Sequence, residues 1–598
     1  MMLPYMTSNV KRERKSISKF GGLNRTVSRG DGELKECINT SGRNYPAMSS
    51  SEPRTEPVDT GVNINGADYK NSLYYTGTTV ASPKVTKMYY GGKSVTVSTD
   101  STASLASRKR SFASQGDSVL IIPDNKIYNT SDNSIYTVEY SKTVTQSSAY
   151  EAARSECNTS SLYNISDYVG EITSAGIVSS KFSTNGYTSY LMTFEEIKAG
   201  DIVHLSMDVS PREYDSIDDN YWDYKARMKE GVDLKITSVN KTEYKTSSGE
   251  VSRITSVEFG ENVLDMGGFS IVVIMSITLS RQMPPLEHVC SLNNRVWGVY
   301  DNTIRCSKLG DCSHWYDFTA DAYGTLPSSC FSTEVDSNGS FTAIVPYGGS
   351  IVAFKENCLH KIYGSDPDSY TLSTLDCKGV KEGCADTVAV LDGTVYYMGI
   401  DGVYAYRGGT PELVSKKPDL SAAEAICAGT DGINYYLSVR EKGSAVMYIY
   451  YPDCKVWHRE EISSDTSCMV SAGSKLYSAA GTYLACLRGE SGDKAVSWSF
   501  AMEFDEDMYN TRSYGRLLIN YSLSKDGEFV IKSVCDGDTS LTCISPESNH
   551  RENAYSVIPL PFIGCKDFRL EFEGRGDFTL KNITREYVIT PEENNNLI

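Results

Sequence analysis

The sequence predicts an all-β protein: a six- or seven-bladed β-propeller, interrupted by a small inserted β-domain and followed by a C-terminal β-sandwich. Two observations support this fold class. The 598 residues include 41 Tyr and 47 Gly but only 5 Trp and 6 His. Tyr favours pleated, half-buried strands, and Gly favours the tight turns between them. A turn-and-strand pattern also recurs at a spacing typical of propeller blades.

The first 60 residues are expected to form an N-terminal extended arm. A Pro- and Ser-rich stretch at 49–57 bounds it. An arm of this kind cannot bury itself, so we expect it to pack on its own domain or on a neighbour. Its basic group at 11–15 is interpreted as solvated charge rather than as a nucleic-acid site, and so is a second group at 108–110.

Six segments share one pattern: a Gly, Asn or Asp turn, an apolar strand, a second turn and a second strand rich in aromatic or aliphatic residues. The second turn residues of the last five segments are 294, 349, 393, 432 and 473, so the spacings are 55, 44, 39 and 41. We interpret the segments as inner strands of successive blades. The six strands lie at 118–123, 295–300, 350–355, 394–398, 433–437 and 474–478.

Two Asp-Gly pairs, at 392–393 and 401–402, flank one of these strands. Asp-Gly between apolar runs is a strong signal for a tight hairpin. A phosphate-binding loop would need a helix directly after the glycines, and no helical pattern follows. The propeller is therefore assigned to 61–144 for its first part and 284–495 for its main part.

The first and second segments lie 177 residues apart, about four times the repeat, so residues 145–283 are expected to be an inserted β-barrel or sandwich domain. The insert contains a turn and alternating strand at 196–206 and a β-branched run at 270–279. The most apolar run, 269–279, has 11 residues, whereas a membrane-spanning helix needs about 20. We expect no stable membrane insertion.

The blade pattern stops after Gly489. From 496 to 590 the chain contains strand patterns without the blade period, such as 516–521, 529–532 and 568–572. The length and pattern predict a C-terminal β-sandwich. The segment 592–596 is expected to fray at the chain end.

Catalytic and metal-binding signatures are missing from the sequence. The six His are dispersed, and no G-x-S-x-G, H-E-x-x-H or P-loop pattern occurs. The 16 Cys include no C-x-x-C pair, so reduced, buried thiols are expected. We therefore predict no enzyme, no catalytic residues, no cofactor and no metal site. A dispersed glycosidase site, built from carboxylates on several blades, is the enzymatic alternative.

Two local stretches are candidate sites. Residues 307–315 faintly resemble the Asp box of sialidase propellers, but Asp311 and Gly310 stand in the wrong order and the box is not repeated. The acidic run 215–220 lacks the spacing, Gly and terminal Glu of an EF-hand loop, so a solvated loop is the preferred interpretation. The net charge of -18 also opposes general binding to a phosphate backbone.

A set of short motifs is specific in its order and spacing, chiefly in the passage 293–415. The motifs are Asn293–Gly298, Ser307–Asp311, Trp315, Phe318, Phe341–Ala343, Phe354–Glu356, His360–Ser365, Asp401–Tyr404, Tyr451–Asp453, Trp457–His458 and, in the arm, Phe20–Asn24, Asn39–Ser41 and Tyr45–Met48. With these residues the chain resembles a family of phage and prophage structural proteins with β-propellers. The resemblance covers about 450 residues and excludes much of the insert. The Cys content and the insert depart from the family pattern.

Such proteins are similar to the nozzle or hub proteins of short-tailed phages. The resemblance implies a homo-oligomeric ring in the tail region of a virion, assembled in the bacterial host cytoplasm. It implies contacts with portal, adaptor, tail tip or fibre proteins and passage of double-stranded DNA without sequence-specific binding. An acidic subunit would let a duplex slide. The alternative function is a receptor- or carbohydrate-binding tail module.

Overall fold

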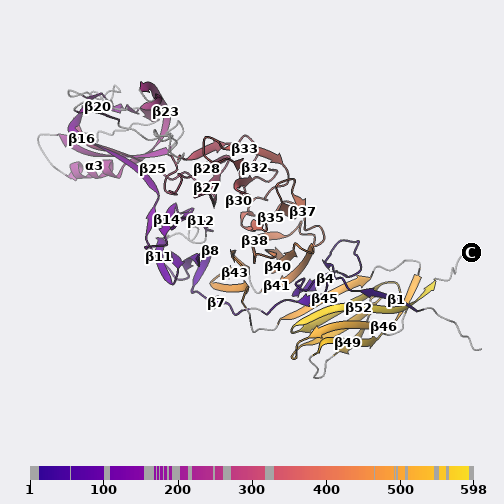
Figure 1. Ribbon diagram of the computed structural model, residues 1–598. Helices are drawn as coiled ribbons and strands as arrows, with labels where there is room; N and C mark the ends of the chain where they lie inside the picture. The colour runs from indigo at the N-terminus through magenta and orange to yellow at the C-terminus, as the bar shows by residue number, and fades with distance from the viewer. Residues whose placement is uncertain are drawn as a thin grey trace, which may run out of the picture. The chain divides into compact units, whose positions relative to one another are not determined.

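A computed structural model describes residues 12–591, except 54, 100–107, 154–167, 170–171, 174–175, 179–180, 185–186, 191–201, 213–218, 247–248, 260–270, 317–328, 463–464, 491, 493–495, 505–509, 545–550 and 561–563. Nearly all regular structure is β (Figure 1), and the one α-helix of the described residues is α3 (Asp219–Glu230). The chain forms two compact units. The first comprises 1–112, 336–363 and 372–598, and the second 113–335 and 364–371.

Five four-stranded antiparallel sheets belong to the first unit. In four of them the strands are consecutive along the chain, and in the fifth the N-terminal strand β7 (Val58–Asp59) is the fourth strand, next to β44 (Tyr483–Arg488). Their strands are β8 (Val62–Lys70), β9 (Ser72–Thr79), β10 (Thr86–Tyr90) and β11 (Lys93–Ser98); β30 (Ala343–Tyr347), β31 (Ser350–Phe354), β32 (Cys358–Tyr363) and β33 (Thr371–Asp376); β34 (Ala389–Leu391), β35 (Thr394–Met398), β36 (Val403–Tyr406) and β37 (Glu412–Leu413); β38 (Glu424–Thr430), β39 (Tyr435–Glu441), β40 (Ser444–Tyr451) and β41 (Val456–Glu461); and β42 (Cys468–Ala472), β43 (Lys475–Ala480), β44 (Tyr483–Arg488) and β7 (Val58–Asp59).

Two further sheets of the same kind lie in the second unit. With these, the described residues contain seven four-stranded sheets of the propeller-blade type, and a blade count of six or seven stays a prediction. The strands of the two sheets are β12 (Ser111–Gln115), β13 (Ser118–Ile122), β14 (Lys126–Asn129) and β15 (Ile135–Thr137); and β26 (His288–Leu292), β27 (Arg295–Tyr300), β28 (Thr303–Cys306) and β29 (Phe331–Glu334).

The six repeated segments each supply the second strand of such a sheet. In β31 and β35 all five residues are buried, because both faces of an interior strand are covered and the sequence is accordingly apolar without alternation. In the first unit the first strands contact one another from sheet to sheet, β34 with β38, β38 with β42 and β42 with β8, and the second strand β43 also contacts β8 and β38. The interpretation of the repeated segments as inner strands of the blades stays a prediction.

The sheet β8–β11 is not among the six segments because its second strand, β9, is rich in Thr and lacks the apolar run of the pattern, although Asn71 stands in the turn before it. Asn71 has a φ of 58°, which Asn tolerates better than most residues. A second signal was present in the sequence: Gly91 and Gly92 form the turn between β10 and β11, with φ values of 55° and 78°. Gly-Gly between strands is a common hairpin turn.

The insert contains a seven-stranded sheet in the order β16-β25-β22-β23-β24-β19-β18 and a three-stranded sheet in the order β17-β20-β21. The β-branched run predicted at 270–279 forms β25, which pairs with β16 on one side and β22 on the other. The strands are β16 (Glu139–Ala153), β17 (Tyr168–Val169), β18 (Ile172–Thr173), β19 (Gly176–Val178), β20 (Lys181–Thr184), β21 (Tyr187–Tyr190), β22 (Ile202–Arg212), β23 (Val232–Thr246), β24 (Gly249–Phe259) and β25 (Ile271–Gln282).

The C-terminal region forms two sheets, and the N-terminal arm is part of both (Figure 1). One sheet has the order β49-β46-β52-β6-β5, with β1 on β52 and β50 on β46; the other has the order β4-β45-β51-β47-β48. The strands are β1 (Arg12–Ile17), β4 (Glu36–Ile38), β5 (Thr40–Ser41), β6 (Met48–Ser50), β45 (Ser497–Phe504), β46 (Asn510–Leu523), β47 (Glu528–Cys535), β48 (Asp538–Ile544), β49 (Arg551–Pro559), β50 (Gly564–Cys565), β51 (Phe568–Arg575) and β52 (Phe578–Pro591); β2 (Gly22–Leu23) pairs β3 (Glu33–Leu34) separately.

Stacked aromatic rings join the two C-terminal sheets. Trp498 of β45 lies 4.4 Å from Phe578 of β52, and Phe568 of β51 lies 3.8 Å from Tyr514 of β46, measured between ring centroids. Such pairs stabilise a core beyond the burial of their area. The two sheets therefore pack face to face as a sandwich.

Candidate functional site

The histidines do not come together in a common site among the described residues. His360 and His458 are buried, and burial lowers the pKa of each imidazole to about 4. His204 and His314 are partly exposed and pair with Asp233 and Asp311, at 2.8 and 2.7 Å. His288 lies at the start of β26, and His550 lies outside the described residues.

Of the two candidate stretches, 307–315 forms a loop held by its own side chains. In the segment 307–315, Trp315 is buried and donates its indole N–H to the carbonyl of Cys312, while Asp311 accepts hydrogen bonds from Ser313 and His314. These contacts close a local loop. Of the acidic run, 215–218 lie outside the described residues.

The basic clusters take part in ion pairs. Arg12 and Arg14 of β1 both pair with Glu586, which is buried and also accepts from Arg516. The hydrogen bond from Arg516, with that from Arg14, lowers the pKa of Glu586 to about 2. Lys109 pairs with Asp386 at 2.5 Å. Arg12, Arg14 and Lys109 are at least half exposed, as expected of solvated charge, whereas Arg110 is buried. These ion pairs also attach the arm to β52 and the segment 108–110 to the short 3-10 helix Ala385–Thr387.

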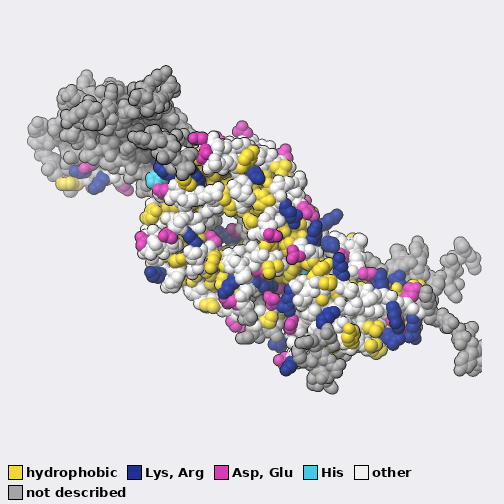
Figure 2. Space-filling model, in the orientation of Figure 1, with side chains coloured by type: hydrophobic (Ala, Val, Ile, Leu, Met, Phe, Trp, Pro, Cys, Tyr) yellow, Lys and Arg dark blue, Asp and Glu magenta, His cyan; other side chains and the backbone are white. Residues whose placement is uncertain are grey.

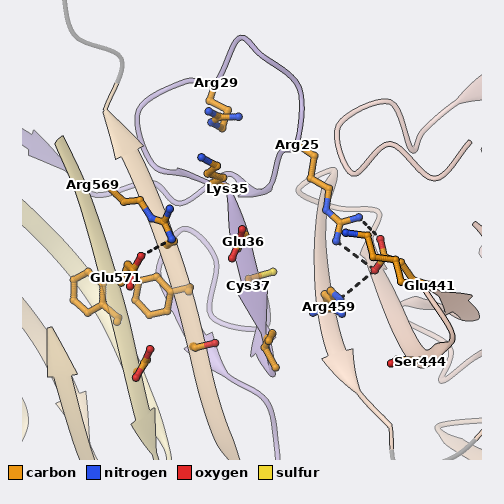
Figure 3. Close-up of a pocket in the computed structure, with 17 residues that line it drawn as sticks. Arg25, Arg29, Lys35, Glu36, Cys37, Glu441, Ser444, Arg459, Arg569 and Glu571 are labelled. Carbon is orange, nitrogen blue, oxygen red and sulfur yellow. Dashed lines mark hydrogen bonds and ion pairs between the residues drawn. The ribbon is translucent and has the colours of Figure 1, made fainter. Parts of the chain in front are cut away.

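A charged cavity of about 640 Å³ lies where three parts of the first unit meet (Figure 3). Its floor is the outward face of the five-stranded sheet. Successive residues of β51 point to opposite faces of this sheet, so that alternate side chains reach the cavity. Phe568, Leu570 and Phe572 enter the core, while Arg569 and Glu571 line the cavity. We call it the junction cavity. Its lining comprises Arg25, Arg29, Lys35, Glu36, Cys37, Ile38, Glu441, Lys442, Ser444, Arg459, Ser499, Phe500, Ala501, Arg569, Glu571, Phe572 and Glu573.

The blade side of the junction cavity centres on Glu441, at the end of β39. Arg25 of the arm pairs with it at 2.6 Å, and Arg459 of β41 lies 3.6 Å from the same carboxylate. Burial opposes ionisation of Glu441. The hydrogen bonds from Arg25 and Tyr448 and the charges of Arg25 and Arg459 together outweigh burial, so the pKa of this carboxyl is lowered. The backbone N–H of Arg25 donates to the carbonyl of Lys417, which fixes the arm beside the blade.

The sandwich side centres on Glu503 of β45. Arg29 and Lys35 of the arm both pair with this carboxylate. Burial opposes its ionisation, but the hydrogen bond from Lys35 and the two positive charges lower its pKa. Lys35 is held in place because its backbone N–H donates to the carbonyl of Ala501, next to the pairing of β4 with β45.

Positive charge remains after these pairs are formed. Glu441 and Glu503 each form ion pairs with two cations. By contrast, Glu571 pairs with Arg569 and Glu573 pairs with Lys532, one cation for each carboxylate. Lys442 has no ion-pair partner within the described part of the chain. In addition, the Nε atoms of Arg29, Arg459 and Arg569 are buried without a hydrogen-bond partner there.

Sequence reasoning missed the junction cavity because its lining is scattered over 25–38, 441–459 and 499–573. One local signal exists: Arg569, Glu571 and Glu573 alternate with apolar residues, which indicates a charged outer strand face. No group of three or more His, Cys, Asp or Glu side chains in the described ranges could hold a metal ion. The described helix is too short and polar to cross a membrane.

Comparison with known proteins gives fold likeness only. No protein family and no curated protein matches the chain. Among solved structures, it is similar to a catalytically inactive virginiamycin B lyase from Staphylococcus aureus (9% identity, 59% of this chain and 100% of that one, TM-score 0.25). It is also similar to Saccharomyces cerevisiae Sqt1 (7%, 74% and 100%, 0.29) and to PorZ of Porphyromonas gingivalis (9%, 92% and 86%, 0.27). At such TM-scores these likenesses carry no argument about function.

Proposed function

We propose that the protein is a non-enzymatic structural subunit of a bacteriophage particle, at the tail or the head-to-tail junction, where copies form a nozzle- or hub-like ring. The observation that carries the proposal is the interlocking of the chain's two ends. Strands of the arm enter both sheets of the C-terminal sandwich, and β7 completes the sheet of β42–β44. The resemblance in 293–415 supports the same role.

Interlocked ends suit a part that bears load. Chain termini are ordinarily the first segments to open locally. Here β1 forms six consecutive residue pairs with β52, and the ion pairs around Glu503 and Glu441 fix the next part of the arm. Opening the arm therefore requires breaking its pairing with β52 and two sets of ion pairs.

The charge of the chain is compatible with DNA passage. A subunit with a net charge of -18 repels a phosphate backbone at long range, so a duplex would slide past it rather than bind. The partners expected for this role are portal, adaptor, tail tip or fibre proteins.

The decisive experiment is quantitative mass spectrometry of particles purified from a producing host, with a host cytoplasmic protein as the contamination control. We expect the chain in fixed stoichiometry with the portal protein. Electron microscopy of the purified protein should show rings. Absence of the chain from infectious particles would overturn the proposal.

The second candidate function, binding of a host receptor or carbohydrate, is favoured by one surface. Tyr555 and Val557 of the edge strand β49 are 77% and 59% exposed and lie on the same face, and Val557 is opposite Leu518. Figure 2 shows hydrophobic side chains over β49, with Lys and Arg side chains nearby. Exposed aromatic rings suit stacking on sugars.

Deleting residues 496–589 cannot test this second function, because the arm would lose its partners. The variant Tyr555→Ser removes the ring from the surface without touching the core. Reduced adsorption of the variant particles to host cells, with unchanged particle assembly, would favour receptor binding. The matched control is Tyr363→Ser, another exposed Tyr outside the sandwich.

A further inference from the structure

The junction cavity has the properties of an anion site. It lies in a chain of net charge -18, yet six Lys and Arg residues line it against four Glu. Glu503 forms ion pairs with both Arg29 and Lys35. Glu441 forms ion pairs with both Arg25 and Arg459. Each of these two carboxylates therefore neutralises only one of its two cationic partners. The volume of 640 Å³ falls within the range of small-molecule sites, about 300–1,000 Å³.

Two hydrogen-bond donors in the lining lack an acceptor. The Nε–H groups of Arg29 and Arg569 are buried and make no hydrogen bond within the described residues. The Nε of Arg459 lies 3.6 Å from an Oε atom of Glu441, beyond hydrogen-bond distance. A buried donor left without an acceptor is costly, particularly when its group is charged. A guanidinium presents Nε–H beside a terminal N–H in a planar fork that matches the two oxygens of a carboxylate or phosphate.

These guanidinium groups come from different parts of the fold. Arg29 belongs to the arm, Arg459 to β41 and Arg569 to β51, and Figure 3 shows Arg459 and Arg569 on opposite sides of the cavity. Lys442 adds a fourth cation from the turn between β39 and β40. One ligand with several acidic oxygens can reach more than one of these walls, whereas a single monovalent ion cannot.

We propose that the junction cavity binds a polyvalent oxyanion, a ligand carrying two or more phosphate or carboxylate groups. Bound there, it accepts hydrogen bonds from the guanidinium groups and balances the charge left by the shared Glu441 and Glu503. It also ties the arm, the blade and the sandwich together. The inference does not depend on the role in a phage particle, since it rests on the cavity alone.

The test is calorimetric titration of the full chain with sodium tripolyphosphate and, separately, with citrate, at low and at high salt. Tripolyphosphate represents phosphate ligands and citrate represents carboxylate ligands. We expect saturable binding of at least one probe that weakens as salt rises. The probe that binds more tightly identifies the chemical source of the natural ligand.

Two variants locate the binding. Lys442→Asn removes a charge at a residue with a φ of 50°, a conformation that Asn tolerates. Its matched control is Lys455→Asn, another Lys in a turn of the same sheet, with a φ of 56°, which does not line the cavity. We expect Lys442→Asn to weaken binding about fivefold, the effect of one unit charge about 4 Å away in water. The control should bind as the unchanged protein does.

Arg459→Gln should weaken binding by about tenfold or more, because it removes a charged donor. Circular dichroism of this variant checks that the fold is kept. The proposal is overturned if neither probe binds at low salt, or if Lys442→Asn and Lys455→Asn bind both probes equally well. Neither result would bear on whether the chain is present in particles.

Discussion

In the sheet β34–β37, each strand pairs with the next one along the chain, and only Asp392 and Gly393 separate β34 from β35. In the sandwich, β1 pairs with β52, so that Arg12 lies opposite Val588. The blade closes short loops, whereas the sandwich joins the two ends of the chain. Because loop-closure entropy must be overcome before distant contacts form, we expect the blades to form early and the sandwich late.

The largest expected effect comes from removing the distant pairing itself. Deleting residues 1–59 removes β1–β7, and with them six buried apolar side chains. Burial of such side chains contributes about 1.5–3 kcal/mol each, so the loss is on the order of 10 kcal/mol. We expect the sandwich to be unfolded, as measured by Trp498 fluorescence and limited proteolysis. The side chains are Ile17, Phe20, Leu23, Leu34, Cys37 and Met48.

The control for this deletion is a chain lacking only residues 1–11, which precede β1. We expect its denaturation midpoint to equal that of the full chain. A full deletion that kept a protease-resistant sandwich would show that the C-terminal strands fold without the arm. In that case the arm would be part of the strand order of the sandwich but would not be needed for the stability of the sandwich.

The second prediction concerns a buried ion pair inside the blade region. Arg488 of β44 donates to Glu460 of β41 at 2.6 Å, and both side chains are buried. Its guanidinium also lies 5.2 Å from the ring centroid of Tyr436. Removing one partner of a buried pair leaves the other charge uncompensated. We expect Arg488→Met to reduce the free energy of unfolding by about 3–5 kcal/mol, measured by urea denaturation.

The double variant Arg488→Met with Glu460→Met tests the cause. Without any buried charge, we expect it to recover most of the lost stability. Equal loss in the single and double variants would show that packing, rather than the uncompensated charge of Glu460, sets the cost. We expect Arg488→Met to reduce the free energy of unfolding by less than loss of the arm does, because the arm pairs the two distant ends of the sandwich whereas the ion pair lies within the blade region.

The same contrast decides what the sequence could predict. Strands such as 394–398 were predicted because their turns and apolar residues lie within a few positions of each other. The all-β class, the blade-type sheets and a sandwich near the C-terminus follow from such local signals. The pairing of Arg12 with Val588 has no local signal, since both strands read only as extended segments of mixed polarity.

The junction cavity could not be predicted from the sequence for the same reason. Arg25 and Arg459 meet at Glu441 only after the arm has crossed from the sandwich to the blade. The basic group at 11–15 shows the same limit. Arg12 and Arg14 are exposed, as an isolated charged run predicts, but only the pairing of β1 places them beside the buried Glu586. Charge patterns show which residues can pair, and only the fold shows their partners.

A third prediction concerns His458 of β41, which contacts the arm strand β5 and so connects a blade with the sandwich. Its Nδ1 lies 2.8 Å from the hydroxyl of Thr40 in the arm, and burial lowers the pKa of the imidazole to about 4. In the unfolded chain the pKa is about 6.5, so the unfolded state takes up the proton first as the pH falls. The contribution of His458 is complete above pH ~6.5 and declines toward pH ~4, by about 3 kcal/mol in total.

Urea denaturation between neutral and acidic pH measures this loss. We expect His458→Gln to lose less stability on acidification than the unchanged protein, because Gln does not titrate and can still hydrogen-bond to Thr40. The exposed His314 supplies the control, and His314→Gln should keep the full acid sensitivity. An unchanged pH profile in His458→Gln would place the acid-sensitive group elsewhere, in His360 of β32 for example, whose pKa is also lowered to about 4.

The smallest expected effect lies in a single blade turn. Gly393 has a φ of 66°, and a Cβ added there would meet no other atom within 4 Å. Gly409 has the same open surroundings without a positive φ, so the pair isolates backbone conformation from steric contact. We expect Gly393→Ala to reduce the free energy of unfolding by about 1 kcal/mol, the cost of holding a side-chain-bearing residue in the left-handed region. Gly409→Ala should be neutral or slightly stabilising, because Ala restricts the unfolded chain. Equal effects of the two substitutions would show that the turn does not set the register of β34 on β35, and the local origin of the blades would have to lie in their apolar strands alone.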